Sequence, residues 1–366
     1  MKIPTKKNFM KKNRVYIIAE AGVNHNGNLD TAKKLVLAAK KSGADAIKFQ
    51  NFVTKELVTK NAKKAPYQIK NTKNKDNQFT MLKKLELKLN DYLDLKNFCK
   101  KIKIDFLTSV FDVESLNFVE KNLKPKVLKI PSGELTNFFL LDKINLKNYS
   151  IILSTGMSNI NEIKKAINRI TKKKIYNLKN NFYKSKNIKN LMNKISIMHC
   201  VTDYPLKNRY ANLECINSMK KKLGFNIDYS DHTTGILAPL IAASKGSRII
   251  EKHFTLNKKL SGPDHKISLD PKQLSLFVKC VNNTSKMLGN YQKKITASEK
   301  VNIIPARKSI YASKNIKKGE KFSKLNLTVK RPQNGIKASS WKKVINQKSN
   351  YNFKKNQLIK LWEKLL

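Results

Sequence analysis

The 366-residue sequence has few cysteines and no long apolar segment, and each shortage excludes a class of protein. Cys99, Cys200, Cys215 and Cys280 are scattered and form neither a CxxC pair nor a disulfide framework, as expected for a protein of the reducing cytoplasm. No run reaches about 18 apolar residues, so we expect no membrane span. The basic segment 1–13 has no apolar h-region after it, and we interpret it as a disordered arm rather than a secretory signal.

Acidic residues are also scarce, because 76 Lys and Arg face 25 Asp and Glu and the formal net charge is +51. Such an excess is typical of nucleic-acid binding. However, the lysines are spread along the whole chain, and arginine, the usual reader of bases, is rare. We therefore interpret the charge as solvated surface and expect no nucleic-acid partner. A polyanion-binding protein stays open as an alternative, and its binding would weaken steeply with salt.

Short apolar runs alternate with helix-like segments as far as about residue 290. Most runs are too continuously apolar to have one wet face, which favours parallel strands covered on both sides. Between them, Asp30 and Asn90 are expected to cap amphipathic helices, the first of which ends near Gly43. The pattern predicts a (β/α)8 TIM barrel, in the α/β class. The eight expected strands are 15–21, 45–50, 105–110, 127–132, 151–156, 195–200, 227–232 and 248–254.

Every expected strand carries a polar or ionisable residue at or near its carboxyl end. In a barrel these ends meet on one rim, which is the catalytic face. We therefore expect one shared site. The residues, in chain order, are Glu20, Lys48, Gln50, Thr108, Lys129, Ser132, Glu134, Ser154, His199, Ser230, Asp231, His232, Glu251 and His253.

The residue types on this rim indicate an anionic substrate and a metal. Lys48 and Lys129 lie between apolar neighbours and would bind phosphate or carboxylate together with the hydroxyls. His232 and His253, on strands seven and eight, would bind one divalent ion with open positions for substrate, and His199 is a third candidate ligand. Glu20 and Glu134 remain as general acid and base groups. This set favours a carbon–carbon condensation over a hydrolysis but does not fix the reactants.

A series of motifs resembles the sialic acid synthase family from about Val15 to Gly289: AEAGVNHNG, KFQ, KIPSGE, STGM, HCVTDYP, YSDHT, EKHFT and GPDH. Further on, IKKGE (Ile316–Glu320) and VKRPQNG (Val329–Gly335) resemble the small antifreeze-like (SAF, β-clip) domain of these enzymes. The resemblance implies a barrel at 14–288 and an SAF domain at 306–366, and the few apolar residues between them indicate a linker at 289–305 after the arm at 1–13 and the barrel.

By resemblance, the chain would condense phosphoenolpyruvate with an N-acylated mannose-type aldose and release phosphate, using Mn2+ or another divalent metal such as Mg2+ or Co2+. His232 and His253 would bind the metal, and Glu20 would handle the proton of the water that attacks carbon 2. Arg331 resembles an arginine that reaches a neighbouring subunit, which implies a domain-swapped homodimer. Phosphoenolpyruvate would be held by Lys48, Thr108, Lys129, Ser132, Ser154 and Ser230. The sugar-side or supporting positions would be Gln50, Glu134, Tyr204 and Asp264.

Thr202 stands where bacterial N-acetylneuraminate synthases often have asparagine. With Asp203 and GPDH, it favours the legionaminic acid synthase branch, whose acceptor is 2,4-diacetamido-2,4,6-trideoxy-mannose. N-Acetylmannosamine as acceptor stays open, as does another phosphoenolpyruvate-dependent 3-deoxy-sugar acid synthase. We expect a basic insertion at 172–194 and interpret 347–366 as a possible amphipathic helix.

Overall fold

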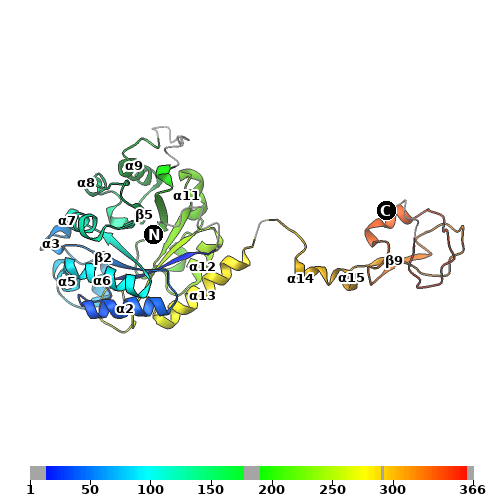
Figure 1. Ribbon diagram of the computed structural model, residues 1–366, viewed down its shortest axis with the longest axis horizontal. Coiled ribbons are helices and arrows are strands. Elements are labelled where there is room, and N and C mark those ends of the chain that lie inside the picture. Colours follow the sequence, from blue (N-terminus) through cyan, green and yellow to red (C-terminus); the bar gives the residue numbers. More distant parts are fainter. Residues whose placement is uncertain (1–13, 177–189, 290–291, 361–366) are drawn as a thin grey trace. The chain divides into compact units, whose positions relative to one another are not determined.

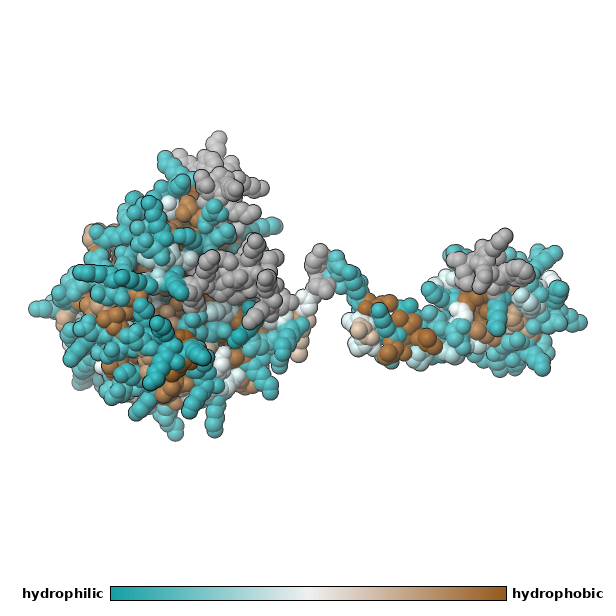
Figure 2. All heavy atoms as spheres, in the orientation of Figure 1, coloured by the Kyte–Doolittle hydropathy of each residue, from teal (hydrophilic) through white to brown (hydrophobic). Residues whose placement is uncertain are grey.

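The computed structural model describes residues 14–176, 190–289 and 292–360, and the predicted arm at 1–13 lies outside them. The chain divides into two compact units, Met1–Gly289 and Asn290–Leu366. Within the described ranges, no helix is long and apolar enough to cross a membrane. Figure 2 shows mainly hydrophilic residues over the visible face of the first unit.

Eight parallel strands of the first unit close into a barrel in the order β1 to β8 (Figure 1), which confirms the predicted (β/α)8 fold. Each strand lies within two residues of its predicted position at either end. The bounds are β1 Tyr16–Gly22, β2 Ala46–Asn51, β3 Asp105–Val110, β4 Val127–Ile130, β5 Ser150–Ser154, β6 Ile195–Cys200, β7 Ile227–Asp231 and β8 Ile249–His253.

Helices surround this barrel, and their starts correct two predictions. Asn28, not Asp30, caps α2 (Leu29–Lys41), because its extended backbone lets the side chain accept a hydrogen bond from the Thr31 amide. The next long helix, α6 (Leu89–Ile102), begins after Lys88 and so includes the predicted cap Asn90. The other helices of this unit are α3 Thr54–Leu57, α4 Pro66–Thr72, α5 Gln78–Leu85, α7 Val113–Phe118, α8 Phe138–Leu141, α9 Ile160–Thr171, α11 Cys215–Leu223, α12 Leu237–Ser244 and α13 Pro271–Met287.

The strands alternate between a helix-facing side and the barrel lumen, and one apolar layer defines the lumen side. This layer consists of Ile18, Ala46, Leu107, Val127, Ile152, Met198 and Ile249. Because side chains on one face of a strand recur every second residue, the next lumen layer toward the carboxyl ends follows from it. It consists of Glu20, Lys48, Ser109, Lys129, Ser154, Cys200, Ser230 and Glu251. A polar layer therefore lies directly above an apolar floor.

The second unit has its own small core around the antiparallel pair β9 (Ser309–Ala312) and β10 (Leu327–Lys330), as predicted for an SAF domain. Residues 347–360 contain isolated bridges such as Ile316↔Phe353 instead of a helix, so the helix interpretation is wrong for this part. The remaining helices are α14 Ala297–Lys300, α15 Ile303–Ala306 and α16 Trp341–Val344.

Candidate active site

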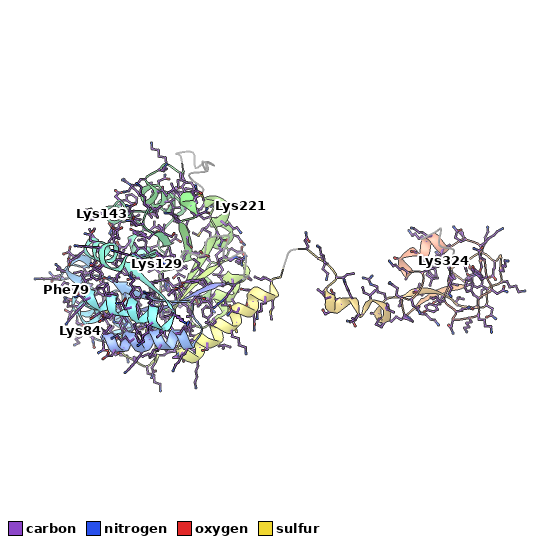
Figure 3. The ribbon with its side chains drawn as sticks, viewed as in Figure 1. Phe79, Lys84, Lys129, Lys143, Lys221 and Lys324 are labelled. Carbon is purple, nitrogen blue, oxygen red and sulfur yellow. The ribbon has the colours of Figure 1, made fainter. Side chains whose placement is uncertain are left out.

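Two lysines and two carboxylates form a buried charge cluster in the lumen. Lys48 Nζ lies 2.8 Å from Glu20 Oε2 and 3.8 Å from Glu251 Oε1. Lys129 Nζ lies 3.5 Å from the same Glu251 oxygen, and Figure 3 labels Lys129 inside the ring of strands. All four side chains are buried. Both lysines form ion pairs with these carboxylates, so a phosphate or carboxylate that binds here would compete for the same cations.

The cluster shifts the pKa values of its members in different directions. Burial raises the pKa of Glu20 to about 7, with Lys48 opposing the shift and Glu251 adding to it. The pKa of Glu251 falls, because Lys129 and Lys48 outweigh the burial that would raise it. Burial lowers the pKa of Lys129, whereas Glu20 and Glu251 overcome burial and raise that of Lys48. Of the two carboxyls of this cluster, Glu20 is therefore the one whose pKa lies near neutral pH.

Three predicted hydroxyls reach this cluster or its rim. Lys129 Nζ donates to Ser154 Oγ, and Ser230 Oγ donates to Glu251 Oε1 at 3.1 Å. Ser132 Oγ accepts from the Gly156 amide at 2.9 Å. A Cβ at Gly156 would clash with the hydroxyls of both Ser132 and Thr202, so the glycine keeps space for them.

Thr108 does not face this cluster, whereas the adjacent Ser109 lies on the lumen side of β3. The lumen residue Leu107 precedes Thr108, which therefore faces the helices, and its hydroxyl donates to the Phe49 carbonyl at 3.3 Å. Ser109 lies opposite Lys129 in the strand register and shares its lumen side. A shift of one residue reverses the face of a strand position. Counting two residues on from Leu107 would have identified Ser109.

The two predicted metal ligands lie side by side, with ring centroids 5.4 Å apart. His232 Nδ1 lies 2.7 Å from the Val201 carbonyl, which makes Nδ1 the protonated nitrogen and leaves Nε2 as an acceptor. His253 Nδ1 is buried and has no hydrogen-bond partner within the described residues. Burial, reinforced by the positive charge of His232 and Lys48, lowers the pKa of His253 well below its usual value, so this imidazole stays neutral.

These residues fit a divalent ion with open coordination positions. Two imidazoles on adjacent strands supply nitrogen ligands, and Nδ1 of His253 is a buried nitrogen without a hydrogen-bond partner among the described residues. Over the described part of the chain, no group of three or more His, Cys, Asp or Glu side chains is arranged to hold a metal. The third candidate, His199, is excluded, because it faces the helices, bonds to the Ala211 carbonyl at 2.8 Å and stacks on Tyr229.

The supporting residues differ in how closely they approach these groups. The Tyr204 ring lies 4.1 Å from that of His232, and Gln50 Nε2 donates to Glu20 Oε1 at 3.3 Å. Asp264 Oδ2 lies 3.9 Å from His253 Nδ1, and burial raises the Asp264 pKa to about 6. Glu134 has a pKa raised by burial, but its hydrogen bond is to Asn137 at 2.6 Å.

Two side chains near the site were not among the predicted binding residues. Tyr67, on α4, packs against Tyr204 with ring centroids 4.8 Å apart and the ring planes tilted by 34°. Cys200 Sγ lies 3.8 Å from His232 Nδ1. Tyr67 comes from the long connection between β2 and α6, so no strand end marks it in the sequence. Arg331, which follows β10, is an exposed residue of the second unit.

Comparison with known proteins identifies the family. A model of the NeuB family matches residues 35–293, and one of the SAF domain matches residues 307–362. The chain belongs to the NeuB family. This confirms the resemblance to sialic acid synthases and the SAF assignment.

Several NeuB-family members are similar over nearly the whole chain. The N,N'-diacetyllegionaminic acid synthase of Campylobacter jejuni is 45% identical over 351 residues, which cover 96% of this chain and 100% of that one. The Legionella pneumophila enzyme of the same name is 37% identical over 95% of this chain and 94% of its own. A crystal structure of N-acetylneuraminic acid synthetase from Leptospira borgpetersenii in complex with citrate is 33% identical and has a TM-score of 0.65, covering 79% of this chain and 90% of that one.

Proposed function

We propose that this NeuB-family member condenses phosphoenolpyruvate with 2,4-diacetamido-2,4,6-trideoxy-mannose to give N,N'-diacetyllegionaminate and phosphate. One observation carries the proposal: two buried lysines of the lumen accompany two neighbouring imidazoles, one of which has a buried nitrogen without a hydrogen-bond partner among the described residues. The lysines would bind the anionic phosphoenolpyruvate, and an ion on the imidazoles would polarise the carbonyl of the sugar. The similarity to two N,N'-diacetyllegionaminic acid synthases supports the choice of sugar.

In the proposed reaction, Lys48 and Lys129 bind the phosphate and carboxylate of phosphoenolpyruvate, assisted by Ser154 and Ser109. Charge-assisted hydrogen bonds in a buried site are strong, because water does not compete for the donors. Carbon 3 of the enol attacks the aldehyde carbon of the sugar and forms the new carbon–carbon bond. Water then adds to carbon 2, and breakage of the bond between carbon 2 and the ester oxygen releases phosphate.

Glu20 is the proposed proton acceptor for that water. Its pKa of about 7 lets it take up a proton near neutral pH. Gln50 Nε2 donates a hydrogen bond to Glu20 Oε1 and so orients the carboxyl group. We propose that Mn2+, or another divalent ion such as Mg2+ or Co2+, is held by His232 and His253. When bound there, the ion supplies Lewis-acid polarisation of the sugar carbonyl.

The sugar preference is tested by product analysis with two acceptors in parallel. Full-length protein, Mn2+ and phosphoenolpyruvate are incubated with either 2,4-diacetamido-2,4,6-trideoxy-mannose or N-acetylmannosamine. We expect a higher kcat/KM with the diacetamido sugar, and phosphate in equal amount to the keto acid. A preference for N-acetylmannosamine would make the chain an N-acetylneuraminate synthase. Phosphate release with neither sugar would contradict the proposed function.

We also propose a homodimer in which the SAF unit of one copy supplies Arg331 to the other copy's barrel. Figure 2 shows hydrophobic residues along α14 and α15, and Ile295, Val301 and Ile304 are 47%, 75% and 58% exposed. Burial in a dimer would remove this apolar surface from water. Sedimentation of the full chain should give a dimer, and mixing Arg331→Ala with His232→Ala should restore part of the activity. A monomer that is fully active would contradict this arrangement.

We further propose that the reaction takes place in the cytoplasm, where the scattered cysteines would stay reduced. Fractionation of cells tests this, because recovery of the protein outside the cytoplasm would contradict it.

A further inference from the structure

A buried ion pair lies on the helix-facing side of β7 and β8, directly behind the two histidines. Asp231 and Lys252 are opposite each other in the strand register, and Lys252 Nζ donates to Asp231 Oδ2. Their side chains are 0% and 1% exposed. Each of the two residues directly precedes a proposed metal ligand in the sequence: His232 follows Asp231, and His253 follows Lys252.

The pair is also tied to the backbone beyond His232. Asp231 Oδ1 accepts from the Thr233 amide at 3.0 Å and from the Tyr229 hydroxyl at 2.9 Å. Asp231 Oδ2 accepts from the Thr233 hydroxyl at 3.1 Å, and Lys252 Nζ donates to the Thr233 carbonyl. The Asp231 carboxylate therefore hydrogen-bonds to Tyr229 before His232 and to Thr233 after it.

We propose that Asp231 and Lys252 are positioning residues that set the spacing of the His232 and His253 imidazoles for a divalent ion. The inference deepens the proposed function and depends on its metal site. The geometry explains how the effect is transmitted. Neighbouring residues of a strand point to opposite sides, so a link between β7 and β8 outside the barrel fixes the two imidazoles inside it.

Stability alone does not account for such a pair. Removing two charges from water is costly, and apolar residues of similar volume often replace a buried ion pair without loss of stability. A link between two metal-ligand strands has another use, because groups that orient metal ligands typically change metal affinity about 10- to 100-fold when they are removed.

The test compares Mn2+ affinity with fold stability in the full-length protein. The double variant Asp231→Asn/Lys252→Met removes both charges together and leaves no unpaired buried ion. We expect it to fold, to bind Mn2+ about 10- to 100-fold more weakly by electron paramagnetic resonance of free Mn2+, and to keep its KM for phosphoenolpyruvate. Tyr229→Phe keeps the ion pair but removes one hydrogen bond to Asp231, and should weaken Mn2+ binding by only a few-fold.

Asp228, at the opposite end of β7, provides a matched control. It is a buried carboxylate on the same strand and accepts from the amides of Arg248 and Ile249 at 2.7 and 2.8 Å. Asp228→Asn should lower stability and leave Mn2+ affinity unchanged.

The outcomes separate the positioning role from the metal site. Wild-type Mn2+ affinity in the folded double variant would overturn the positioning role, as would equal losses of affinity in the double variant and in Asp228→Asn. If the double variant did not fold, an unchanged Mn2+ affinity in Tyr229→Phe would overturn it. If the wild-type protein bound no Mn2+, or if the His232→Ala variant bound Mn2+ as tightly as the wild type, the metal site itself would be overturned and the positioning role with it.

Discussion

The two ends of the barrel use buried polar groups in opposite ways. At the amino ends of the strands, the half-buried Tyr16 hydroxyl donates to Asp105 at 2.7 Å, and the buried Asp228 accepts from two backbone amides at 2.7 and 2.8 Å. At the carboxyl ends, Glu251 Oε2 and His253 Nδ1 are buried without a hydrogen-bond partner among the residues that the structure describes.

This difference indicates which end is built for a ligand. An unsatisfied buried polar group costs about 1–3 kcal/mol, so a folded chain keeps few of them without a reason. The amino end satisfies its polar groups within the protein and so stabilises the barrel. The carboxyl end keeps two lysines beside two carboxylates, and the pKa of one of these, Glu20, is raised to about 7. It also keeps a buried imidazole nitrogen without a partner among the described residues. A bound anion would pair with the lysines, and a bound cation would pair with the imidazole nitrogen.

The largest expected effect comes from removing an imidazole at the carboxyl end. His232→Ala or His253→Ala should abolish turnover and Mn2+ binding, because each removes one of the two proposed protein ligands. Thermal unfolding should show an intact fold, since neither change removes part of the hydrophobic core. Normal turnover in either variant would show that the metal is bound elsewhere.

The second prediction concerns the pH dependence set by Glu20. Its pKa is raised to about 7, so the carboxylate that accepts a proton is present above this pH and is lost as the pH falls through it. We expect kcat/KM to fall on the acid side of about pH 7. Glu20→Gln should lower the plateau by about 100- to 10,000-fold and remove this limb of the profile.

The pH profile of Glu20→Gln also distinguishes Glu20 from its neighbours. Asp264 has a pKa raised to about 6 by burial and is the other carboxyl near the histidines. An acid limb that persists unchanged in Glu20→Gln would assign the base to another group. Loss of phosphoenolpyruvate binding alone would make Glu20 a positioning residue.

Most of the fold was predictable because its signal is repeated. Each strand is a short apolar run, buried on both sides, and the eight runs recur with helical segments between them. The helix starts were less predictable, because Asn28, Asp30 and Asn90 are all good capping residues. Only the backbone conformation selects between them.

The site was predictable to the level of strand ends but not always of strand faces. Lys48, Lys129, Glu20, His232 and His253 are each the one lysine, glutamate or histidine of their expected strand, so the residue type identified them. Thr108 and Ser109 are adjacent hydroxyls on opposite faces, and the sequence alone did not fix which one faces the lumen. His199 was misplaced for the same reason.

The third prediction weakens the anion site without touching the metal ligands. Lys129→Met should raise the KM for phosphoenolpyruvate about 10- to 100-fold, the value of about 1.5–3 kcal/mol for a hydrogen bond to a charged group. Mn2+ affinity, measured in the same preparation, should stay near that of the wild type. Tyr16→Phe, at the amino end, is the control and should affect stability only. An unchanged KM in Lys129→Met would exclude this lysine from the anion site.

The smallest effect compares the adjacent hydroxyls of β3. Ser109→Ala should raise the KM for phosphoenolpyruvate several-fold, because it removes a neutral hydrogen bond worth about 1 kcal/mol. Thr108→Val should leave the KM unchanged and alter only stability, since Thr108 faces the helices and Ser109 faces the lumen. The reverse result would mean that Thr108 faces the lumen in the working enzyme.

A crystal structure of the full chain with phosphoenolpyruvate and Mn2+ tests the central claim most directly. We predict the phosphoenolpyruvate anion on Lys48 and Lys129, with Mn2+ between His232 and His253. An anion bound outside the lumen, or Mn2+ on residues other than these histidines, would contradict the account.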